Sequence, residues 1–382
     1  MKGFKNAKIY VEGKEIVETN LAVDGSKIFS IGENVDVEEY CEVQKDWIVV
    51  PGFIDQHIHG ALGSDAMDGT IEDIQKMASA VAKEGTTCFL PTTMTQSIEN
   101  ICIALKAIND YMNKNYETGS RVLGVHLEGP FISPDFIGAQ PLEYVQKPDV
   151  ETFKKYEEAS GNNIRIVSLA PEVEGSKELM EYLTSKGILV SLGHTNSKYS
   201  DVEQAVASGA RNVTHTFNAQ KPLHHREIGT VGSALLLDEL NCELICDTIH
   251  VSVPAIRLVV KSKPADKVTL ITDSMRAKHL SDGEYDLGGQ PVIVKNGEAR
   301  LINGTLAGSV LKMNHAVRNV HKLAGIELTK VLDMASINPA RNIGVDHERG
   351  SIKVGKYADF VVLDENFEVV MTIRDGNVIY QR

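Results

Sequence analysis

Eight short apolar segments along the middle of the chain, separated by helix-like stretches, limit the folds open to this sequence more than any other feature. The first leads to His57, and the others span 87–90, 122–125, 164–167, 188–191, 212–214, 244–246 and 268–271. Strands that alternate with helices form a parallel sheet, and eight of them over about 300 residues predict a (β/α)8 barrel. An open doubly wound sheet shows the same alternation. However, no Gly-x-Gly-x-x-Gly or Walker motif follows any strand, which removes the usual nucleotide-binding reason for an open sheet.

The two ends of the chain follow a different pattern. Residues 1–50 and 345–382 contain short β-rich runs separated by turn signals such as Asp24-Gly25 and Asp375-Gly376, which are typical of hairpins. Neither end has enough apolar residues to be stable alone, so we expect the two to pair. The expected architecture is α/β: a TIM-like (β/α)8 barrel over 51–344 and a small β-sandwich formed by the N- and C-terminal segments.

Composition narrows the class of protein. The 382 residues carry a net charge of −13, which argues against nucleic acid or an anionic membrane as the main partner. The N-terminus lacks an apolar signal core and no apolar run is long enough to span a bilayer, so we expect a cytoplasmic protein. The five cysteines are odd in number and lack CxxC spacing, which favours reduced thiols over a disulfide framework.

Polar side chains suited to metal binding or proton transfer follow six of the eight expected strands. They are His57 and His59, His126 and Glu128, His194, His215, His250, and Asp273. The carboxyl ends of barrel strands meet on one rim, where the active site lies, so these groups should converge. A single histidine at a strand end is more often structural, but so many polar groups on one rim would be costly without a function.

Four of the histidines and two carboxylates suit one or two divalent cations. His57 and His59 lie two residues apart on a strand, so they point to the same face and can bind one ion. With two ions, Glu128 would lie between this pair and the histidines at 194 and 215. Asp273 can take a proton from bound water and pass it to a leaving nitrogen, or it can be a further ligand.

The motifs that carry these groups resemble those of a known family. They are PGFIDQHIHG (51–60), HLEGPF (126–131), LGHT (192–195), THTFNA (214–219), DTIHV (247–251), ITDS (271–274) and GTLAGS (304–309). Along its whole length the chain resembles the amidohydrolase superfamily and, within it, the N-acetylglucosamine-6-phosphate deacetylases. The resemblance implies a hydrolase of linear amide C–N bonds that converts N-acetyl-D-glucosamine 6-phosphate to D-glucosamine 6-phosphate and acetate in amino-sugar metabolism. The alternatives are another amide hydrolase or deaminase of the superfamily, and a non-catalytic scaffold, which should lack some of the ligands.

The resemblance also implies roles for the rim residues. Glu128, His194 and His215 match the family's metal ligands, and Glu128 stands where many amidohydrolases have a carboxylated lysine. Because the first His-x-His motif is retained, we expect two divalent cations per subunit, whether zinc, iron(II) or manganese. A metal-activated hydroxide would attack the carbonyl, and Asp273 would act as general base and acid.

Contacts to the substrate are implied at further positions. They fall on Ala139, Gln140, Asn218, Ala219, Arg226, His250, Leu306, Ala307 and Gly308. Some relatives have a histidine where Gln140 stands; a neutral glutamine can only donate a hydrogen bond to the amide carbonyl, which leaves more of the polarisation to the metals. Arg226 has the fork that phosphate oxygens prefer, although a solvated loop is the alternative for this basic cluster. In the family the matching arginine reaches the neighbouring active site, so we expect a homodimer.

Overall fold

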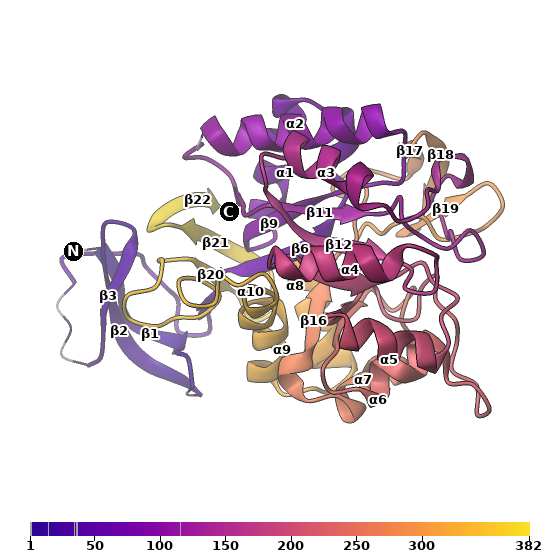
Figure 1. The fold of residues 1–382 in the computed structure, drawn as a ribbon. Helices are drawn as coiled ribbons and strands as arrows, with labels where there is room; N and C mark the ends of the chain where they lie inside the picture. Colours follow the sequence, from indigo (N-terminus) through magenta and orange to yellow (C-terminus); the bar gives the residue numbers. More distant parts are fainter. Residues whose placement is uncertain (1, 14, 34, 36, 115) are drawn as a thin grey trace.

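The computed structural model describes residues 2–13, 15–33, 35, 37–114 and 116–382. It consists of a parallel barrel surrounded by helices and a separate sheet built from both ends of the chain (Figure 1). The fold class predicted from the sequence is therefore confirmed. Among the described residues, no helix is both long and apolar enough to cross a membrane.

All eight strands expected for the barrel are present. In chain order they are β6 (Phe53–Ile58), β9 (Thr86–Thr93), β11 (Val125–Glu128), β12 (Ile164–Leu169), β13 (Leu189–Leu192), β14 (Asn212–Val213), β15 (Asn241–Ile245) and β16 (Val268–Ile271). Successive strands pair in parallel in this order. Just after β16 the amide of Asp273 donates to the carbonyl of His57 at 2.8 Å, which brings the last strand against the first.

Helices cover the outside of the barrel (Figure 1). They are α1 (Ile71–Ala82), α2 (Ile98–Lys114), α3 (Val150–Ala159), α4 (Ser176–Ser185), α5 (Tyr199–Ala207), α6 (Gly229–Leu236), α7 (Val253–Ser262), α8 (Met313–Arg318) and α9 (Leu328–Ala335). In α1, Thr70 caps the first turn by accepting a hydrogen bond from the amide of Asp73 at 3.1 Å. The buried residues Ile74, Met77 and Val81 recur at helical spacing, so one face of this helix packs inward.

Short elements complete the barrel and its loops. They are β7 (Gly60–Ala61), β8 (Ser64–Asp65), β10 (Arg121–Val122), the 3-10 turns at Ala66–Asp68, Leu142–Tyr144 and Ala265–Lys267, and a π-helical turn at Asn319–Leu323 that continues α8. The segment expected as one strand over 122–125 is divided between β10 and β11, and Gly124, whose φ is 149°, lies between the two. As a result His126 and Glu128 lie within β11 rather than after it.

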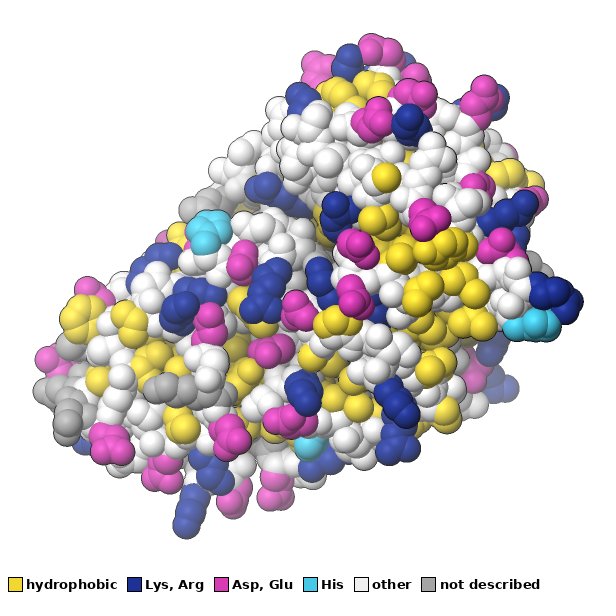
Figure 2. Space-filling model, turned by 60° about the horizontal axis from the view of Figure 1, so that its bottom comes forward, with side chains coloured by type: hydrophobic (Ala, Val, Ile, Leu, Met, Phe, Trp, Pro, Cys, Tyr) yellow, Lys and Arg dark blue, Asp and Glu magenta, His cyan; other side chains and the backbone are white. Residues whose placement is uncertain are grey.

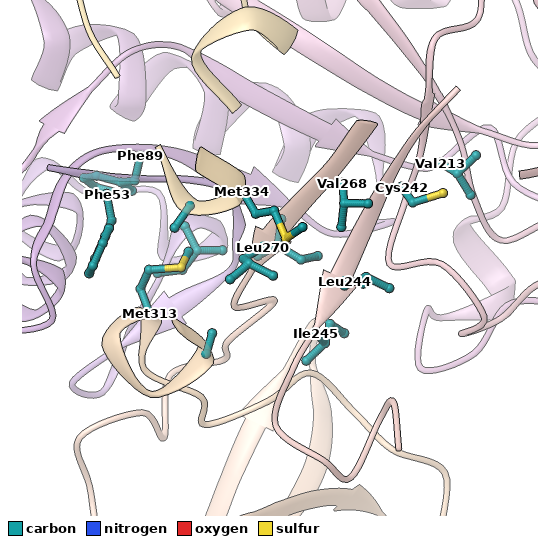
Figure 3. Packing of buried hydrophobic residues seen from close by; sticks show 14 of the residues in the cluster. Phe53, Phe89, Val213, Cys242, Leu244, Ile245, Val268, Leu270, Met313 and Met334 are labelled. Carbon is teal, nitrogen blue, oxygen red and sulfur yellow. The ribbon is translucent and has the colours of Figure 1, made fainter. Parts of the chain in front are cut away.

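The main hydrophobic core lies between the barrel strands and the surrounding helices. Figure 3 shows Leu244 of β15 close to Val268 and Leu270 of β16, with Met334 of α9 beside Leu270. All four side chains are fully buried. Burial of each such side chain stabilises the fold by about 1.5–3 kcal/mol.

A further helix, α10 (Ile337–Asn342), closes one end of the barrel. Ile337 and Ala340 form a cluster with Ile54 near the start of β6 and with residues of three other strands. Nδ2 of Asn342 donates to Thr269, near the start of β16, at 3.2 Å. The helix therefore lies at the N-terminal end of the strands, and the other end of the barrel is left for the site.

The terminal segments form one eight-stranded sheet. Its strands are β1 (Lys2–Tyr10), β2 (Ile16–Asp24), β3 (Lys27–Ile31), β4 (Glu39–Tyr40), β5 (Ile48–Pro51), β20 (Phe360–Leu363), β21 (Val369–Arg374) and β22 (Asn377–Gln381). β5 joins the two halves, because it pairs with β1 on one side and with β20 on the other. Phe4 and Phe360 lie in a shared core with their rings 5.5 Å apart. The two ends thus complete one another, and hydrogen bonds join their strands into a single sheet.

A three-stranded antiparallel sheet after β16 lies outside the elements expected from the sequence. It consists of β17 (Gly283–Leu287), β18 (Gln290–Lys295) and β19 (Glu298–Leu301). Asn296 and Gly297, both with positive φ, connect β18 to β19. Asn-Gly between two β-rich runs is a strong hairpin signal, so this element could have been predicted. In Figure 1 the small sheet lies on the side of the barrel opposite the terminal sheet.

Charged side chains of both signs are mixed on the surface (Figure 2). On the face shown in Figure 2, lysine and arginine side chains are interspersed with aspartate and glutamate rather than gathered into one patch.

The five cysteines are all free thiols, and Cys88, Cys242 and Cys246 are buried.

Candidate functional site

A cavity of about 330 Å³ opens at the carboxyl ends of the barrel strands. Its lining brings together residues that are far apart in the sequence: His59, Met94, Glu128, Gly138, Ala139, Gln140, His194, His215, Asn218, Ala219, His250, Asp273, Leu287, Arg300, Thr305, Leu306 and Gly308. A larger hollow of about 860 Å³, beside Lys2 and Asp375, contains none of the rim histidines. The smaller cavity is therefore the candidate site.

Glu128 and two histidines form a tight group of donor atoms. Nε2 of His215 lies 3.0 Å and Nε2 of His194 lies 3.2 Å from Oε1 of Glu128, and the two nitrogens are 3.1 Å apart. Ligand atoms about 2 Å from a tetrahedral ion lie roughly 3.3 Å from one another. This group therefore has the spacing of a divalent-cation site.

A second group shares Glu128. Nε2 of His59 lies 3.3 Å from Oε2 of Glu128 and 3.2 Å from Oδ1 of Asp273. Nε2 of His57, which is fully buried, lies 3.4 Å from Nε2 of His59 and 3.5 Å from both Glu128 and Asp273. The Glu128 carboxylate thus lies between the two histidine pairs, and Asp273 borders the second group.

Hydrogen bonds decide which ring nitrogen carries the proton in three of these histidines. Nδ1 of His57 lies 3.2 Å from the carboxylate of Glu243. Nδ1 of His59 and Nδ1 of His194 each lie 3.1 Å from a backbone carbonyl oxygen. Since these oxygens can only accept, each Nδ1 donates, and in the neutral ring each Nε2 presents a lone pair. Lone pairs and carboxylate oxygens so close together repel one another unless a cation lies among them, so the residues fit one or two divalent cations.

The charge balance of the site points the same way. Burial alone lowers the pKa of His59, but its hydrogen bonds to Asp273 and Glu128 and their charges outweigh burial and raise this pKa to about 10. Burial alone raises the pKa of Asp273, but the neighbouring imidazoles His57 and His59 lower it to about 2. Both shifts express the attraction of the two carboxylates for positive charge.

Three of these residues have an unusual backbone conformation. The φ angle is 48° at His194, 30° at His215 and 47° at Asp273. Positive φ is uncommon for residues other than glycine, and it costs on the order of 1–3 kcal/mol at each position. Strain of this size persists only where the surrounding fold enforces it, and its concentration on this rim supports a functional role.

Most residues expected to contact substrate lie at the cavity. Ala139, Gln140, Asn218, Ala219, His250, Leu306 and Gly308 line it, and Ala307 is buried beside them. The side chain of Gln140 is already engaged: Nε2 donates to Oε2 of Glu128 at 2.8 Å, and Oε1 accepts from the amide of Thr95 at 2.7 Å. In this arrangement Gln140 fixes the position of Glu128.

Arg226 lies away from the cavity. Its side chain is exposed on the loop before α6, and its guanidinium lies 2.8 Å from Nε2 of His225. It does not line the cavity of its own subunit. The structure therefore does not bring Arg226 together with the other residues expected to contact substrate.

The strand-end pattern did not reveal Arg300. This residue of β19 is the one lysine or arginine among the described residues that line the cavity. Its Nε donates to Glu298 and its guanidinium donates to the carbonyl of Gly304, both at 2.7 Å. The second bond braces the loop that carries Leu306 and Gly308. The Asn-Gly hairpin signal could have predicted the strand, but not its position over the barrel.

Two buried groups lie beneath the cavity. His126, expected at the rim, instead points into the barrel, where Nδ1 donates to the carbonyl of Gln56 at 3.1 Å and Nε2 lies 2.7 Å from the hydroxyl of Ser168. Burial lowers the pKa of His126 to about 3, so the ring is neutral. Glu243, which no motif singled out, is fully buried and contacts His57.

Comparisons with known proteins agree with this geometry. The sequence profile described as the amidohydrolase family matches residues 48–379. The chain is 40% identical to an N-acetylglucosamine-6-phosphate deacetylase of Bacillus subtilis, over 98% of this chain and 96% of that protein. It is 37% identical to an N-acetylgalactosamine-6-phosphate deacetylase of Escherichia coli O157:H7, over 84% and 85%. The crystal structure of an N-acetylglucosamine-6-phosphate deacetylase from Thermotoga maritima superposes with a TM-score of 0.91 at 35% identity, covering 100% of both chains.

Proposed function

This chain belongs to the amidohydrolase family, and we propose that it hydrolyses the N-acetyl amide of N-acetyl-D-glucosamine 6-phosphate to D-glucosamine 6-phosphate and acetate. Similar proteins with this activity match it over nearly their whole length. The observation that carries the proposal is the convergence of four histidine Nε2 atoms on Glu128, with Asp273 beside them, at a cavity of about 330 Å³. A cavity of this size suits a single phosphorylated sugar.

The metal chemistry follows from this donor set. A divalent cation bound here would polarise the amide carbonyl and lower the pKa of a nearby water. Glu128, His194 and His215 would hold one cation. The pair at 57 and 59, together with Glu128, would hold the second, so we propose two per subunit, with zinc, iron(II) or manganese all compatible with nitrogen and oxygen ligands.

Asp273 is our candidate for proton transfer. Its carboxylate lines the cavity, and its low pKa keeps it ionised and ready to accept a proton from the attacking water. The same proton is then available to the amide nitrogen as the C–N bond breaks, so that the amine leaves neutral. Gln140 holds Glu128 in place during these steps, because its amide donates to Oε2 of that carboxylate.

A substrate panel tests the choice of sugar. Acetate release is measured from N-acetylglucosamine 6-phosphate, from N-acetylgalactosamine 6-phosphate and from unphosphorylated N-acetylglucosamine. We expect kcat/KM for the first to exceed that for the galacto isomer by about tenfold or more, since a misplaced hydroxyl leaves polar groups unpaired. Preference for the galacto isomer would instead assign the chain to the activity of its Escherichia coli relative.

We further propose that the protein is a homodimer in which Arg226 of one subunit binds the substrate phosphate in the other. His250 lines the cavity, and its Nδ1 lies 2.6 Å from the carboxylate of Asp247, which holds the ring in place. The exposed position of Arg226 supports a role across an interface. We expect Arg226→Ala to raise KM for the phosphorylated sugar by roughly 10–100-fold, because a charge-assisted hydrogen bond is lost. KM for the unphosphorylated sugar should stay within about twofold.

Mixed dimers separate the trans arrangement from a contact within one subunit. Arg226→Ala and Asp273→Asn subunits are unfolded, mixed in equal amounts and refolded together. In the trans arrangement each heterodimer regains one intact site, so about a quarter of all sites should recover wild-type kinetics. No recovery in refolded dimers would place Arg226 in its own subunit's site or remove it from the mechanism. Equal effects on both sugars would refute the phosphate contact.

Two further assignments accompany this function. We propose domain boundaries at 1–50 with 345–382 for the terminal domain and 51–344 for the catalytic barrel. The pairing of β5 with both β1 and β20 supports the grouping of the two ends. We also propose a cytoplasmic location, where the phosphorylated sugar would be available.

A further inference from the structure

We propose that Glu243 is a positioning residue that makes His57 a metal ligand and ties the two histidine pairs together from inside the barrel. Glu243 lies on β15, is fully buried and does not line the cavity. The inference rests on the metal site of the proposed function and extends it to a residue beneath that site.

The Glu243 carboxylate accepts four hydrogen bonds. Oε1 accepts from Nε2 of Gln56 at 2.6 Å and from Nδ2 of Asn212 at 2.9 Å. Oε2 lies 3.2 Å from Nδ1 of His57 and accepts from the amide of His215 at 3.2 Å. Two donors on each oxygen use the full accepting capacity of a carboxylate.

The buried charge of Glu243 needs a counter-charge. In the part of the chain that the structure describes, the four donors on this carboxylate include no lysine or arginine. A buried carboxylate without a cationic partner is strongly destabilising. Among these donors, the His57 ring connects Glu243 to the cation that Nε2 of His57 would bind. Second-layer carboxylates that hold metal-binding histidines work in this way.

A chain of hydrogen bonds fixes the orientation of these partners. Because Nδ1 of His126 donates to a carbonyl, its Nε2 must accept, and each hydroxyl in the chain has only one proton to give. The bonds therefore run, from donor to acceptor, along Asn212, Ser191, Thr214, Ser168 and His126. Oδ1 of Asn212 accepts from Asn241 at 2.8 Å, which leaves its amide group turned toward Glu243.

Glu243 acts on both histidine pairs through this geometry. Because Glu243 accepts a hydrogen bond from Nδ1 of His57, the Nε2 lone pair of this ring faces Glu128 and His59. Glu243 also accepts a hydrogen bond from the backbone amide of His215, and this bond supports the backbone of His215 at its φ of 30°. We expect the first effect to be the larger, because the proton position decides whether His57 can bind a cation at all.

Glutamine at position 243 cannot reproduce this arrangement. It offers one oxygen where four donors need two, so its NH2 group must face one pair of them. If that group faces His57, the ring accepts at Nδ1 and carries its proton on Nε2, where it blocks the cation. If the NH2 group instead faces Gln56 and Asn212, it meets two other NH2 donors. The hydrogen bonds along the chain of hydroxyls must then run in the opposite direction.

The test counts bound metal and does not depend on turnover. Wild type, Glu243→Gln, Glu243→Asp and Ser191→Ala are stripped of metal and titrated with Co²⁺ against a competing chelator, with cobalt per subunit measured by mass spectrometry. In Glu243→Gln we expect one cation to bind about 10–100-fold more weakly and the other to change by less than about fivefold. Glu243→Asp, which keeps both oxygens, should recover part of the loss. Ser191→Ala, which breaks the hydroxyl chain without touching His57, should retain both cations.

Several results would overturn the proposal. Wild-type affinity for both cations in Glu243→Gln would do so, and so would equal weakening of both with a lowered melting temperature, since that pattern marks a purely structural role. If Glu243→Gln does not fold, ¹⁵N NMR of labelled histidine in the Zn²⁺-loaded wild type decides the question. We expect His57 to keep its proton on Nδ1 and to bind the cation through Nε2, and binding through Nδ1 would contradict the proposal. Failure of the acetate assay would leave these readouts unchanged, so the two proposals fail separately.

Discussion

Asp273→Asn is expected to lower kcat for N-acetylglucosamine 6-phosphate by about 10³-fold, the typical contribution of a general acid–base group. Asparagine keeps the shape of the side chain but cannot accept the proton of the attacking water. The loss should fall on kcat rather than KM, because the cavity and its sugar contacts are unchanged. Steady-state acetate release from the purified variant measures both constants.

A metal count on the same sample separates loss of the base from loss of a ligand. Oδ1 of Asp273 lies 3.2 Å from Nε2 of His59. The other donor group, in which His194 and His215 contact Glu128, does not include Asp273. We therefore expect at least one cation per subunit to remain in Asp273→Asn. Retained full turnover with metal bound would remove Asp273 from the mechanism.

Glu128→Gln is expected to have a larger effect, because this carboxylate borders both histidine pairs. Oε1 lies 3.0 Å from His215 and Oε2 lies 3.3 Å from His59, so one substitution changes both donor groups. A neutral amide removes the negative charge on which cation binding depends. We expect bound metal to fall well below one per subunit and kcat to fall by on the order of 10⁴-fold.

Asp273→Asn is the matched control for Glu128→Gln, since each variant replaces one rim carboxylate with its amide. The account predicts that metal is lost from the Glu128 variant and largely kept in the Asp273 variant. If Glu128→Gln binds two cations as tightly as wild type, Glu128 is not a shared ligand. The two-cation assignment would then have to be rebuilt from the histidines alone.

The rim of the site could be predicted from the sequence because parallel strands end at one edge. His57 and Asp273 are 216 positions apart, yet each belongs to a barrel strand or its carboxyl end, so the topology alone brings them together. Motifs around Glu128, His194 and His215 gave the same grouping by resemblance. The first of these inferences needed only the order of the strands and the direction of the barrel, whereas the second needed the family motifs.

Other parts of the site could not be predicted in this way. Glu243 lies in the middle of a strand, and whether its side chain faces the interior depends on the barrel's register, which periodicity does not supply. Arg300 reaches the cavity because β17 to β19 lie over the rim, a tertiary arrangement without local signal. The engagement of Gln140 with Glu128 likewise depends on the path of an irregular loop.

The measurement that tests the central claim most directly is acetate release from N-acetylglucosamine 6-phosphate by one preparation in three states: as purified, stripped of metal, and refilled stepwise with a divalent cation. Unphosphorylated N-acetylglucosamine is measured in parallel. We predict that stripping leaves less than about 1% of the rate, that refilling restores it as cations are bound, and that the phosphorylated sugar is strongly preferred throughout. Undiminished turnover by protein shown to contain no metal would contradict the account.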